Sequence, residues 1–385
     1  MAAENKVSGE PWVDVPTARC LLQWLVTGIQ PEDYTVAATS ELAAWLTRQG
    51  LGALAYGRCA DADLALRRYL QGEMFAAAAE SSLKQSELQA ILKALADNEV
   101  PSVLLKGAAL SLTVYDDPAW RTMSDIDFWV QDADMQLSAQ LMVGLGYEIN
   151  VKGERPFLLQ QLSRGEIVFV QPARTHSFVE FHWSPFPGWW LKRTAVVDEI
   201  GLWGRREPLL DPQGLLPIGY QLAPEDTVIQ LAAHTAVNHQ FTLSALRSLV
   251  DIALTVEKRD VAWAVVAERA SEWRVGTAVY TVLDLVDQLI GVAGLESALI
   301  QINPSSLRRW LIHCFVTPES VLAGRDWQHG WQRFVLLLLL VDRRRDMVKL
   351  VIRTLWPEPA WLAARYGDNV GNWKHLWRMI RYRGV

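Results

Sequence analysis

The chain has 385 residues, half of them hydrophobic, with 37 Lys and Arg against 43 Asp and Glu and a net charge of −6. This length and composition are typical of a folded protein with a large core and two or three domains. The acidic balance excludes general nucleic-acid binding, and the longest apolar run, Phe334 to Val341, is too short to span a bilayer.

Helices are predicted from residue 16 to about residue 98, because apolar residues recur there at helical spacing. The period then changes to short apolar runs, which indicate strands. A helix follows the first strand, another covers residues 135–145, and a Pro-containing turn joins the last two strands. The four predicted strands are Val103–Leu105, Asp125–Val130, Ile167–Val170 and Phe178–Trp183.

This order of elements predicts an α+β fold, in which a small mixed β-sheet with its own helices is flanked by helical regions on both sides. The segment after the sheet is rich in Gly and Pro, and Pro224 is a plausible helix start. The expected division is an N-terminal helical region 1–80, a core 81–187, a linker or substrate-facing loop 188–223 and a C-terminal helical domain 224–385.

Three carboxylates dominate the predicted sheet. Residues two apart on a strand point to one face, so Asp125 and Asp127 project together while Ile126 and Phe128 enter a core. Two neighbouring carboxylates repel each other, and such a pair usually has a cation between them. Glu180 on a nearby strand would complete an all-oxygen site suited to Mg²⁺.

Residues 104–109, Arg121, Ser124–Asp127 and 180–183 together carry a family resemblance. They resemble a long-uncharacterised bacterial nucleotidyltransferase-like family of the DNA polymerase β superfamily. The resemblance covers about residues 87–256 firmly and the far C-terminus loosely. It implies a nucleotidyltransferase core that contains the predicted sheet.

The resemblance also implies roles for a set of residues. Backbone N–H groups at Gly107 would bind triphosphate oxygens at a helix start. The superfamily's usual Ser after this Gly is Ala108 here, and the loop before the aspartates is longer than the superfamily norm. Metal and catalytic roles fall on Asp125, Asp127 and Glu180, and nucleotide binding falls on Lys106, Gly107, Ala108, Arg121, Ser124 and His182.

The implied reaction transfers a nucleoside monophosphate from ATP or another NTP to a hydroxyl, with two Mg²⁺ ions as cofactors. A peptide or small-molecule acceptor is expected, because members of the resembling family often accompany natural-product pathways. Phosphoryl transfer at the same site remains an alternative. So do a non-catalytic nucleotide- or partner-binding protein, and a toxin-like enzyme that modifies tRNA or protein.

Several residues have a structural interpretation beside the functional one. Arg121 either binds phosphate or pairs with Asp117, and Glu180 either binds metal or pairs with Arg174 or Arg164. A structural, hydrogen-bonded role for His182 is equally open. The sequence also predicts that His234 and His239, five apart on a helix, lie on different faces, and that Arg247 and Asp251 form an i,i+4 pair.

Three further features concern the chain as a whole. Its 18 Trp residues are expected mainly to fill a helical core, with a groove at Trp183, Trp189 and Trp190 as the alternative. Residues 343–385 contain ten Lys or Arg against three Asp or Glu, which indicates a solvated helix face or an anion-binding tail. Widely spaced cysteines and an N-terminus without an apolar leader predict a cytoplasmic protein.

Overall fold

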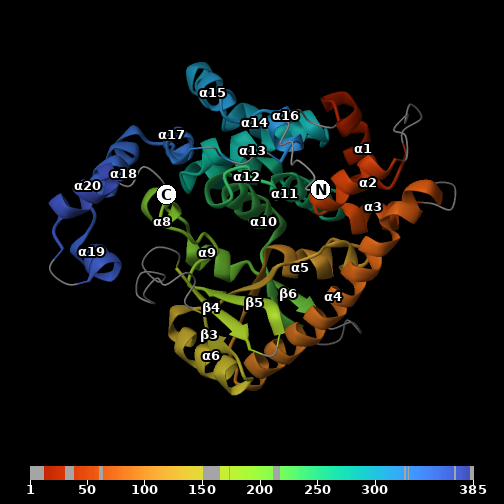
Figure 1. Ribbon diagram of the computed structural model, residues 1–385, viewed down its shortest axis with the longest axis horizontal. Helices are drawn as coiled ribbons and strands as arrows, with labels where there is room; N and C mark the ends of the chain where they lie inside the picture. The colour runs from red at the N-terminus through yellow and green to blue at the C-terminus, as the bar shows by residue number, and fades with distance from the viewer. Residues whose placement is uncertain are drawn as a thin grey trace, which may run out of the picture.

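A mixed seven-stranded sheet lies between layers of helices in the computed structural model (Figure 1). The fold is α+β, as the sequence predicts. The structure describes residues 13–30, 39–59, 64–150, 165–172, 174–210, 217–324, 327, 329–367 and 370–381.

All four predicted strands form, and three more join them. The central pair β1 and β2 is antiparallel, whereas β2 and β5 are parallel and β1 and β7 are parallel. The order across the sheet is β3-β4-β5-β2-β1-β7-β6. The strands are β1 Val103–Leu105, β2 Asp125–Trp129, β3 Glu148–Ile149, β4 Glu166–Gln171, β5 Arg174–His182, β6 Glu207–Leu210 and β7 Pro217–Gln221.

The two faces of the sheet belong to different cores, because side chains alternate along each strand. Ile126 and Phe128 of β2 are fully buried against α4 and α6, and Phe128 stacks on Phe181 of β5 with 5.0 Å between ring centroids. Trp129 instead joins the core of the C-terminal helices. Asp125 and Asp127 share the face of Trp129, so they are directed toward those helices.

The N-terminal region is helical, and its last helix runs on into the sheet layer. Helix α4 is continuous from Leu64 to Asp97 and crosses the expected boundary at residue 80, since Leu88, Ile91 and Leu92 bury their side chains on the sheet. Figure 1 shows α4 and α6 on the sheet side away from the C-terminal helices. The helices of these layers are α1 Val15–Thr27, α2 Ser40–Arg48, α3 Gly52–Arg58, α4 Leu64–Asp97, α5 Lys106–Thr113, η1 Pro118–Trp120 and α6 Asp132–Gly144.

The segment 188–223, expected to be a linker or loop, contains two short helices and two strands of the sheet. It contains α8 Leu191–Thr194 and α9 Glu199–Gly204, and its strands β6 and β7 extend the sheet beside β1. Their short sequences lack a clear alternating pattern. Local propensity therefore does not predict these strands. They form because β7 pairs with β1 and β6 pairs with β7.

The C-terminal half is helical, as predicted, and Pro224 occupies the first turn of α10. Its central helix α13 is buried along most of its length. The helices are α10 Pro224–Ala233, the π-helical turn η3 His234–Asn238, α11 Ala245–Lys258, α12 Trp263–Glu272, α13 Gly276–Leu289, α14 Leu295–Gln301, α15 Ser306–His313, α16 Pro318–Leu322, α17 Gly330–Leu340, α18 Arg344–Leu355, α19 Pro359–Tyr366 and α20 Asn372–Arg381.

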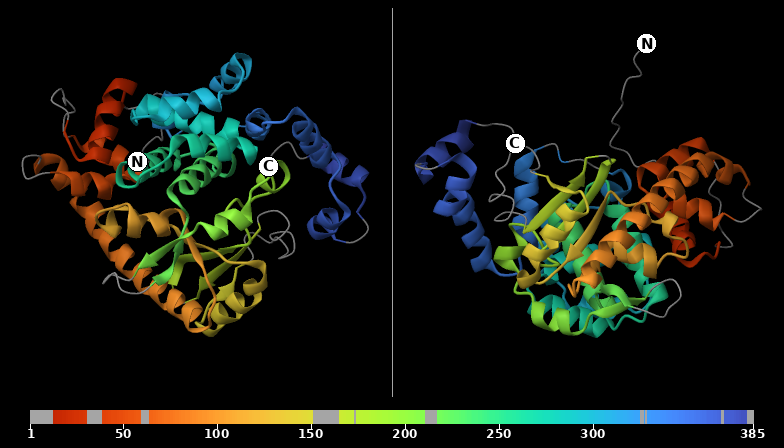
Figure 2. Two further views of the ribbon diagram at one scale, coloured as in Figure 1. Left: turned by 180° about the vertical axis from the view of Figure 1, so that it is seen from behind. Right: turned by 90° about the horizontal axis from the view of Figure 1, so that it is seen from below.

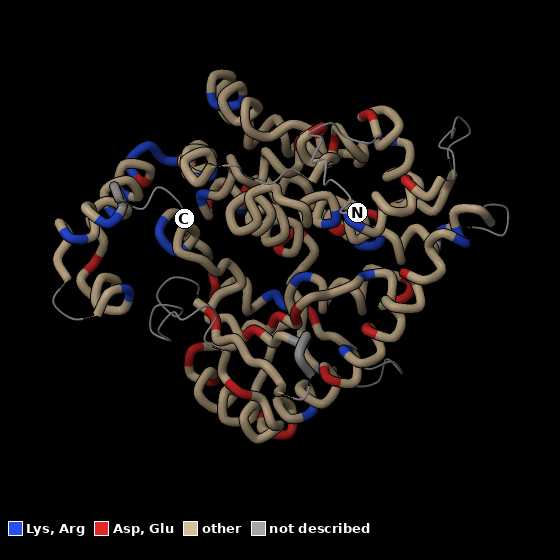
Figure 3. The backbone as a smooth tube through the Cα atoms, viewed as in Figure 1, with Lys and Arg blue, Asp and Glu red and all other residues tan. Residues whose placement is uncertain are grey.

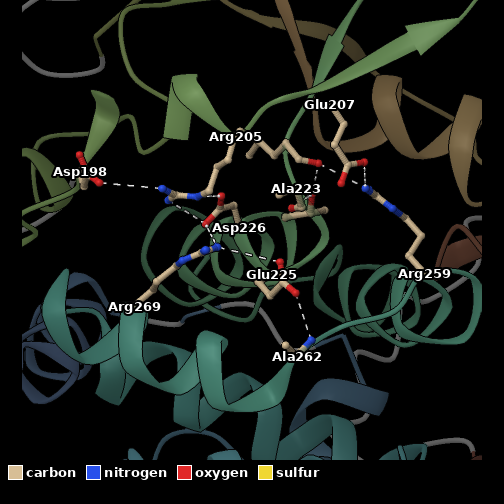
Figure 4. A network of polar contacts seen from close by, with 11 residues as sticks. Asp198, Arg205, Glu207, Ala223, Glu225, Asp226, Arg259, Ala262 and Arg269 are labelled. Atoms are coloured by element: carbon tan, nitrogen blue, oxygen red, sulfur yellow. Dashed lines mark hydrogen bonds and ion pairs between the residues drawn. The ribbon is translucent and has the colours of Figure 1, made fainter. Parts of the chain in front are cut away.

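An ionic network fixes the helical domain to the segment that follows the main strands (Figure 4). Asp226 at the start of α10 is fully buried and accepts hydrogen bonds from Arg205, after α9, and from Arg269 of α12. Arg259 pairs with Glu207 of β6. The buried carboxylate of Asp226 joins the two layers through both guanidinium groups, because a charge in the interior requires such partners.

Helices α18–α20 form an arm at the opposite end of the molecule from α1–α3 (Figure 2). The positions of its Lys and Arg residues are coloured blue along the backbone tube in Figure 3. Among the described residues, the strongly exposed Trp side chains lie in the last quarter of the chain, whereas Trp129, Trp203 and Trp273 pack in the interior. None of the described helices has the length and apolar character needed to cross a membrane.

Candidate active site

The pairing of β2 with β5 places Asp127 directly beside Glu180. The two strands are parallel, and Asp127 and Glu180 are register partners, so their side chains leave the same face of the sheet. Both carboxylates are buried, and ligand atoms of Asp127, Glu180 and His182 all lie within 4.8 Å of one another. The structure thus brings together two of the three predicted carboxylates and adds an imidazole.

Asp125 lies one pleat away on the same face and is half-buried. Its Oδ1 accepts a hydrogen bond of 2.9 Å from the Ser124 hydroxyl. Burial, followed by the charge of Asp127, raises the pKa of the Asp125 carboxyl. The predicted repulsion between the two aspartates is therefore present in the folded protein.

Lys106 supplies the positive charge nearest to these carboxylates. Its Nζ donates a 2.8 Å hydrogen bond to Asp127 Oδ1, and the ammonium is largely enclosed. Burial alone would lower the pKa of Lys106, but the charges of Asp127, Asp125 and Glu180 outweigh it and raise the pKa. The backbone of Lys106 has φ of +50°, a left-handed conformation that non-glycine residues rarely adopt outside functional sites.

His182 lies behind Asp127 and is completely buried. Its Nε2 is 2.7 Å from Asp127 Oδ1, and its Nδ1 is 3.6 Å from an oxygen of Glu166 on the neighbouring strand β4. Lys106 and His182 together lower the pKa of Asp127 against the effect of burial. His182 therefore holds the carboxylate in place, and Glu166, which the sequence analysis did not single out, lies on its far side.

A cavity of about 80 Å³ opens beside the aspartates. One wall comes from the sheet and the start of α5, with Lys106, Gly107, Asp125 and Asp127, and the other comes from α10, η3 and α11. Glu180 is buried next to Asp127 and, within the described part of the chain, is not among the lining residues. The cavity therefore meets the carboxylate group from the side of Asp125 and Asp127.

Gly107 and Ala108 take different places at the start of α5. A Cβ atom on Gly107 would lie 3.2 Å from both Arg121 Nη1 and Met123 Cγ, so a larger residue would crowd the cavity wall. The Ala108 side chain is buried in the sheet core. Only backbone groups of Ala108 could reach a ligand, whereas Gly107 borders the cavity directly.

His234 and His239 lie together, contrary to the expectation that five-residue spacing separates them. The backbone N–H of His239 donates to the carbonyl of His234 over 3.0 Å, which closes a π-helical turn, and the two rings are 4.5 Å apart between centroids. Such turns are rare and recur at functional sites. Both rings line the cavity, and burial is the main reason that the pKa of His239 falls to about 4 and that of His234 falls well below its ordinary value.

Arg121 is buried and pairs with Asp251 of α11, not with Asp117. Nε and Nη2 donate to the two carboxylate oxygens over 2.8 Å each, and the Tyr115 hydroxyl donates to the same carboxylate over 2.7 Å. The predicted i,i+4 pair of Arg247 with Asp251 is therefore wrong, because the Asp251 carboxylate binds Arg121 instead. Helical spacing alone could not reveal the pair, since 130 residues separate Arg121 from Asp251.

Two other predictions concern the Trp residues at positions 189 and 190 and the arginine partners of Glu180. Trp190 contacts Trp189 and Phe334 of α17, which favours the structural role of these rings over an open groove. The side chain of Arg174 and all of Arg164 fall outside the described residues, so their expected pairing with Glu180 stays a prediction.

The carboxylate group has the chemistry of a divalent-cation site. Asp125, Asp127 and Glu180 offer the oxygen ligands that Mg²⁺ prefers. Burial, and then the charge of Asp127, raise the pKa of Asp125, and a bound cation would favour its ionised form. The residues present therefore fit the metal that the sequence analysis predicts.

Residues 36–291 match the model of a family described as an uncharacterised nucleotidyltransferase. The match includes α2 to α13, and so contains the whole sheet and both walls of the cavity. No curated protein and no solved structure gives a significant match to the chain.

Proposed function

We propose, since the chain belongs to this uncharacterised nucleotidyltransferase family, that it transfers a nucleoside monophosphate from ATP or another NTP to an acceptor hydroxyl. The observation that carries the proposal is the position of Asp127, which is register partner to Glu180 and two residues from Asp125 at the mouth of one cavity. A cluster of this charge is costly to build without a cation, and phosphate-bound Mg²⁺ is a cation of the right kind.

Asp125, Asp127 and Glu180 would hold the ion or ions, and two ions are proposed by analogy with two-metal phosphoryl-transfer sites. Bound Mg²⁺ would neutralise phosphate charge and make the acceptor hydroxyl a better nucleophile. Lys106 keeps Asp127 ionised, and His182 orients it through Nε2. The N-terminal turn of α5 at Gly107 presents backbone N–H groups to phosphate oxygens.

The reaction is an in-line displacement at the α-phosphorus. The acceptor oxygen forms a bond to that phosphorus while the bond to the bridging oxygen of the β-phosphate breaks, and pyrophosphate leaves with the electron pair. The hydroxyl proton passes to a carboxylate of the Asp125, Asp127 and Glu180 group. Closing the site against water would strengthen each of these electrostatic interactions.

We propose a peptide or a small metabolite as the acceptor. The cavity beside the aspartates is narrow, about 80 Å³, which suits a single hydroxyl-bearing group presented to the phosphates. The acidic balance of the chain disfavours long nucleic-acid acceptors.

ATP labelled at the α- or the γ-phosphorus tests the proposal. The full chain is incubated with MgCl₂ and a panel of hydroxyl-bearing peptides and small molecules. Nucleotidyl transfer leaves the α-label on the product and releases pyrophosphate, whereas a γ-labelled product would establish phosphoryl transfer instead. Failure of the protein to bind Mg–ATP by calorimetry would refute the proposed activity with this nucleotide.

A non-catalytic binding protein is the second candidate, and two observations favour it. Ala108 stands where the superfamily usually has Ser, and the loop before the aspartates, which contains η1, is longer than the superfamily norm. Under this alternative the protein binds Mg–ATP and its biological function survives substitution of both Asp125 and Asp127 by Asn.

A further inference from the structure

Arg247 of α11 lies where two cavities meet. One is the narrow cavity beside Asp125 and Asp127. The other is an open cavity of about 580 Å³, which helices α2 and α4 of the N-terminal region line together with residues 242–244. Arg247 and Ser244 line both. A group extending from the aspartates into the larger cavity would therefore pass the Arg247 guanidinium.

Two guanidinium groups share one backbone carbonyl at this junction. Arg121 and Arg247 both donate from Nη1 to the carbonyl oxygen of Thr122, over 2.6 and 3.3 Å. The nearby carboxylate of Asp251 is fully occupied, since Arg121 binds both of its oxygens and Tyr115 donates to one of them. Within the described residues, Arg247 forms no ion pair of its own.

Two features of Arg247 itself favour an anion, although Glu73 and Glu80 also line the larger cavity. The charge of Arg121, and then burial, lower the pKa of Arg247 to about 10, so a negative ligand would stabilise its charged form. Arg247 lies in the first turn of α11, a helix of 14 residues, where the helix dipole also favours negative charge. Ser244 and Ser248 bring hydroxyl groups to the same cavity.

We propose that Arg247 binds a phosphate group of the donor nucleotide at the junction of the two cavities. This role rests on the proposed function and specifies it, because it places the phosphates between the carboxylates of the sheet and the start of α11. The planar guanidinium can bind two phosphate oxygens at once. Arg121 is a positioning residue in this arrangement: its pair with Asp251 holds α11 against the sheet and leaves the second guanidinium for the ligand.

Calorimetric titration of the full chain with Mg–ATP, Mg–pyrophosphate and adenosine tests this role. Arg247→Gln should weaken binding of both phosphate ligands by about ten- to a hundred-fold, the usual effect of losing a charge-assisted hydrogen-bond partner, and leave adenosine binding unchanged. Arg247→Lys should lose less, since the charge remains. Arg68→Gln, at an exposed position of α4, is the matched control and should bind as wild type does.

The outcomes separate the two claims. Equal affinities of wild type and Arg247→Gln for Mg–pyrophosphate would overturn the phosphate role and leave the proposed function standing. Wild type that binds neither phosphate ligand would overturn both. A thermal melt checks the fold of each variant, and we expect little change for Arg247→Gln, because it removes one hydrogen bond to a backbone carbonyl. If Arg247→Gln unfolds, the affinities of Arg247→Lys and wild type for the two phosphate ligands are compared instead.

Discussion

Lys106 and Asp127 form an ion pair of 2.8 Å at the junction of β1 with α5, and both side chains are almost fully enclosed. The lysine follows directly on the strand whose last residue, Leu105, is the register partner of Asp127. A positive charge is thereby built into the carboxylate group. It offsets part of the repulsion among Asp125, Asp127 and Glu180.

Substitution of Lys106 by Met should destabilise the protein by about 3–5 kcal/mol, because it leaves the buried Asp127 without its ammonium partner. MgCl₂ should restore part of the loss, since a divalent cation can replace the missing charge and ligand binding stabilises the folded state. Urea unfolding with and without MgCl₂ measures both effects. Lys93→Met, which breaks the exposed pair with Asp97, should cost less than about 1 kcal/mol. Equal unfolding midpoints for Lys106→Met and wild type would contradict the prediction.

Asp125→Asn should reduce nucleotide transfer by about a thousand-fold or more and leave the fold intact, because Asp125 is half-buried and, in the described part of the chain, forms no ion pair with a lysine. Adding Asp127→Asn should abolish Mg–ATP binding. Release of pyrophosphate and calorimetry measure the two effects. Ser124→Ala removes only the hydrogen bond to Asp125 and is the matched control, with a loss of less than about ten-fold. Full activity in Asp125→Asn would remove this carboxylate from the mechanism.

His239 should make the protein less stable at acid pH. Its pKa is about 4 in the folded protein and near 6.5 when unfolded, so between these values the unfolded chain binds a proton that the folded chain does not. Stability is therefore fully present above pH 6.5 and is lost as the pH falls toward 4, by at most about 1.4 kcal/mol per pH unit.

His239→Gln removes this proton and should flatten the dependence of unfolding free energy on pH between 6.5 and 4. Urea unfolding at several pH values measures the slope, and His313→Gln at an exposed position of α15 gives the background for losing one imidazole. An unchanged slope in His239→Gln would show that the buried ring does not control acid stability.

Asp251→Leu should cost about 3–5 kcal/mol of stability, because it leaves the Arg121 guanidinium buried without a counter-charge. Arg121→Met combined with Asp251→Leu should recover much of this loss, since two apolar side chains leave no charge to satisfy. Chemical denaturation of the four proteins in this double-mutant cycle gives the coupling energy. Additive losses would mean that the pair does not act as a unit.

Local pattern was sufficient to predict β1, β2 and the hairpin of β4 with β5. In β2, apolar Ile126 and Phe128 alternate with Asp125 and Asp127, and a two-residue period fixes which side chains share a face. The helix that begins at Pro224 was predictable for a similar reason, because proline is well suited to a first helical turn. The carboxylates of the candidate site were therefore evident from the sequence.

Tertiary structure decided what those carboxylates face. Strands β6 and β7 have no strong pattern, and they depend on the pairing of β7 with β1 and of β6 with β7. The ion pair of Arg121 with Asp251 joins residues 130 apart in sequence. The π-helical turn brings His234 and His239 together, although an α-helix would separate them. Each of these features is a long-range contact or a departure from regular geometry. These features are stabilised by packing between residues that are distant in sequence. Only the folded structure therefore shows that Arg121 is bound by Asp251, whereas Arg247 faces the cavity where we propose an anionic ligand.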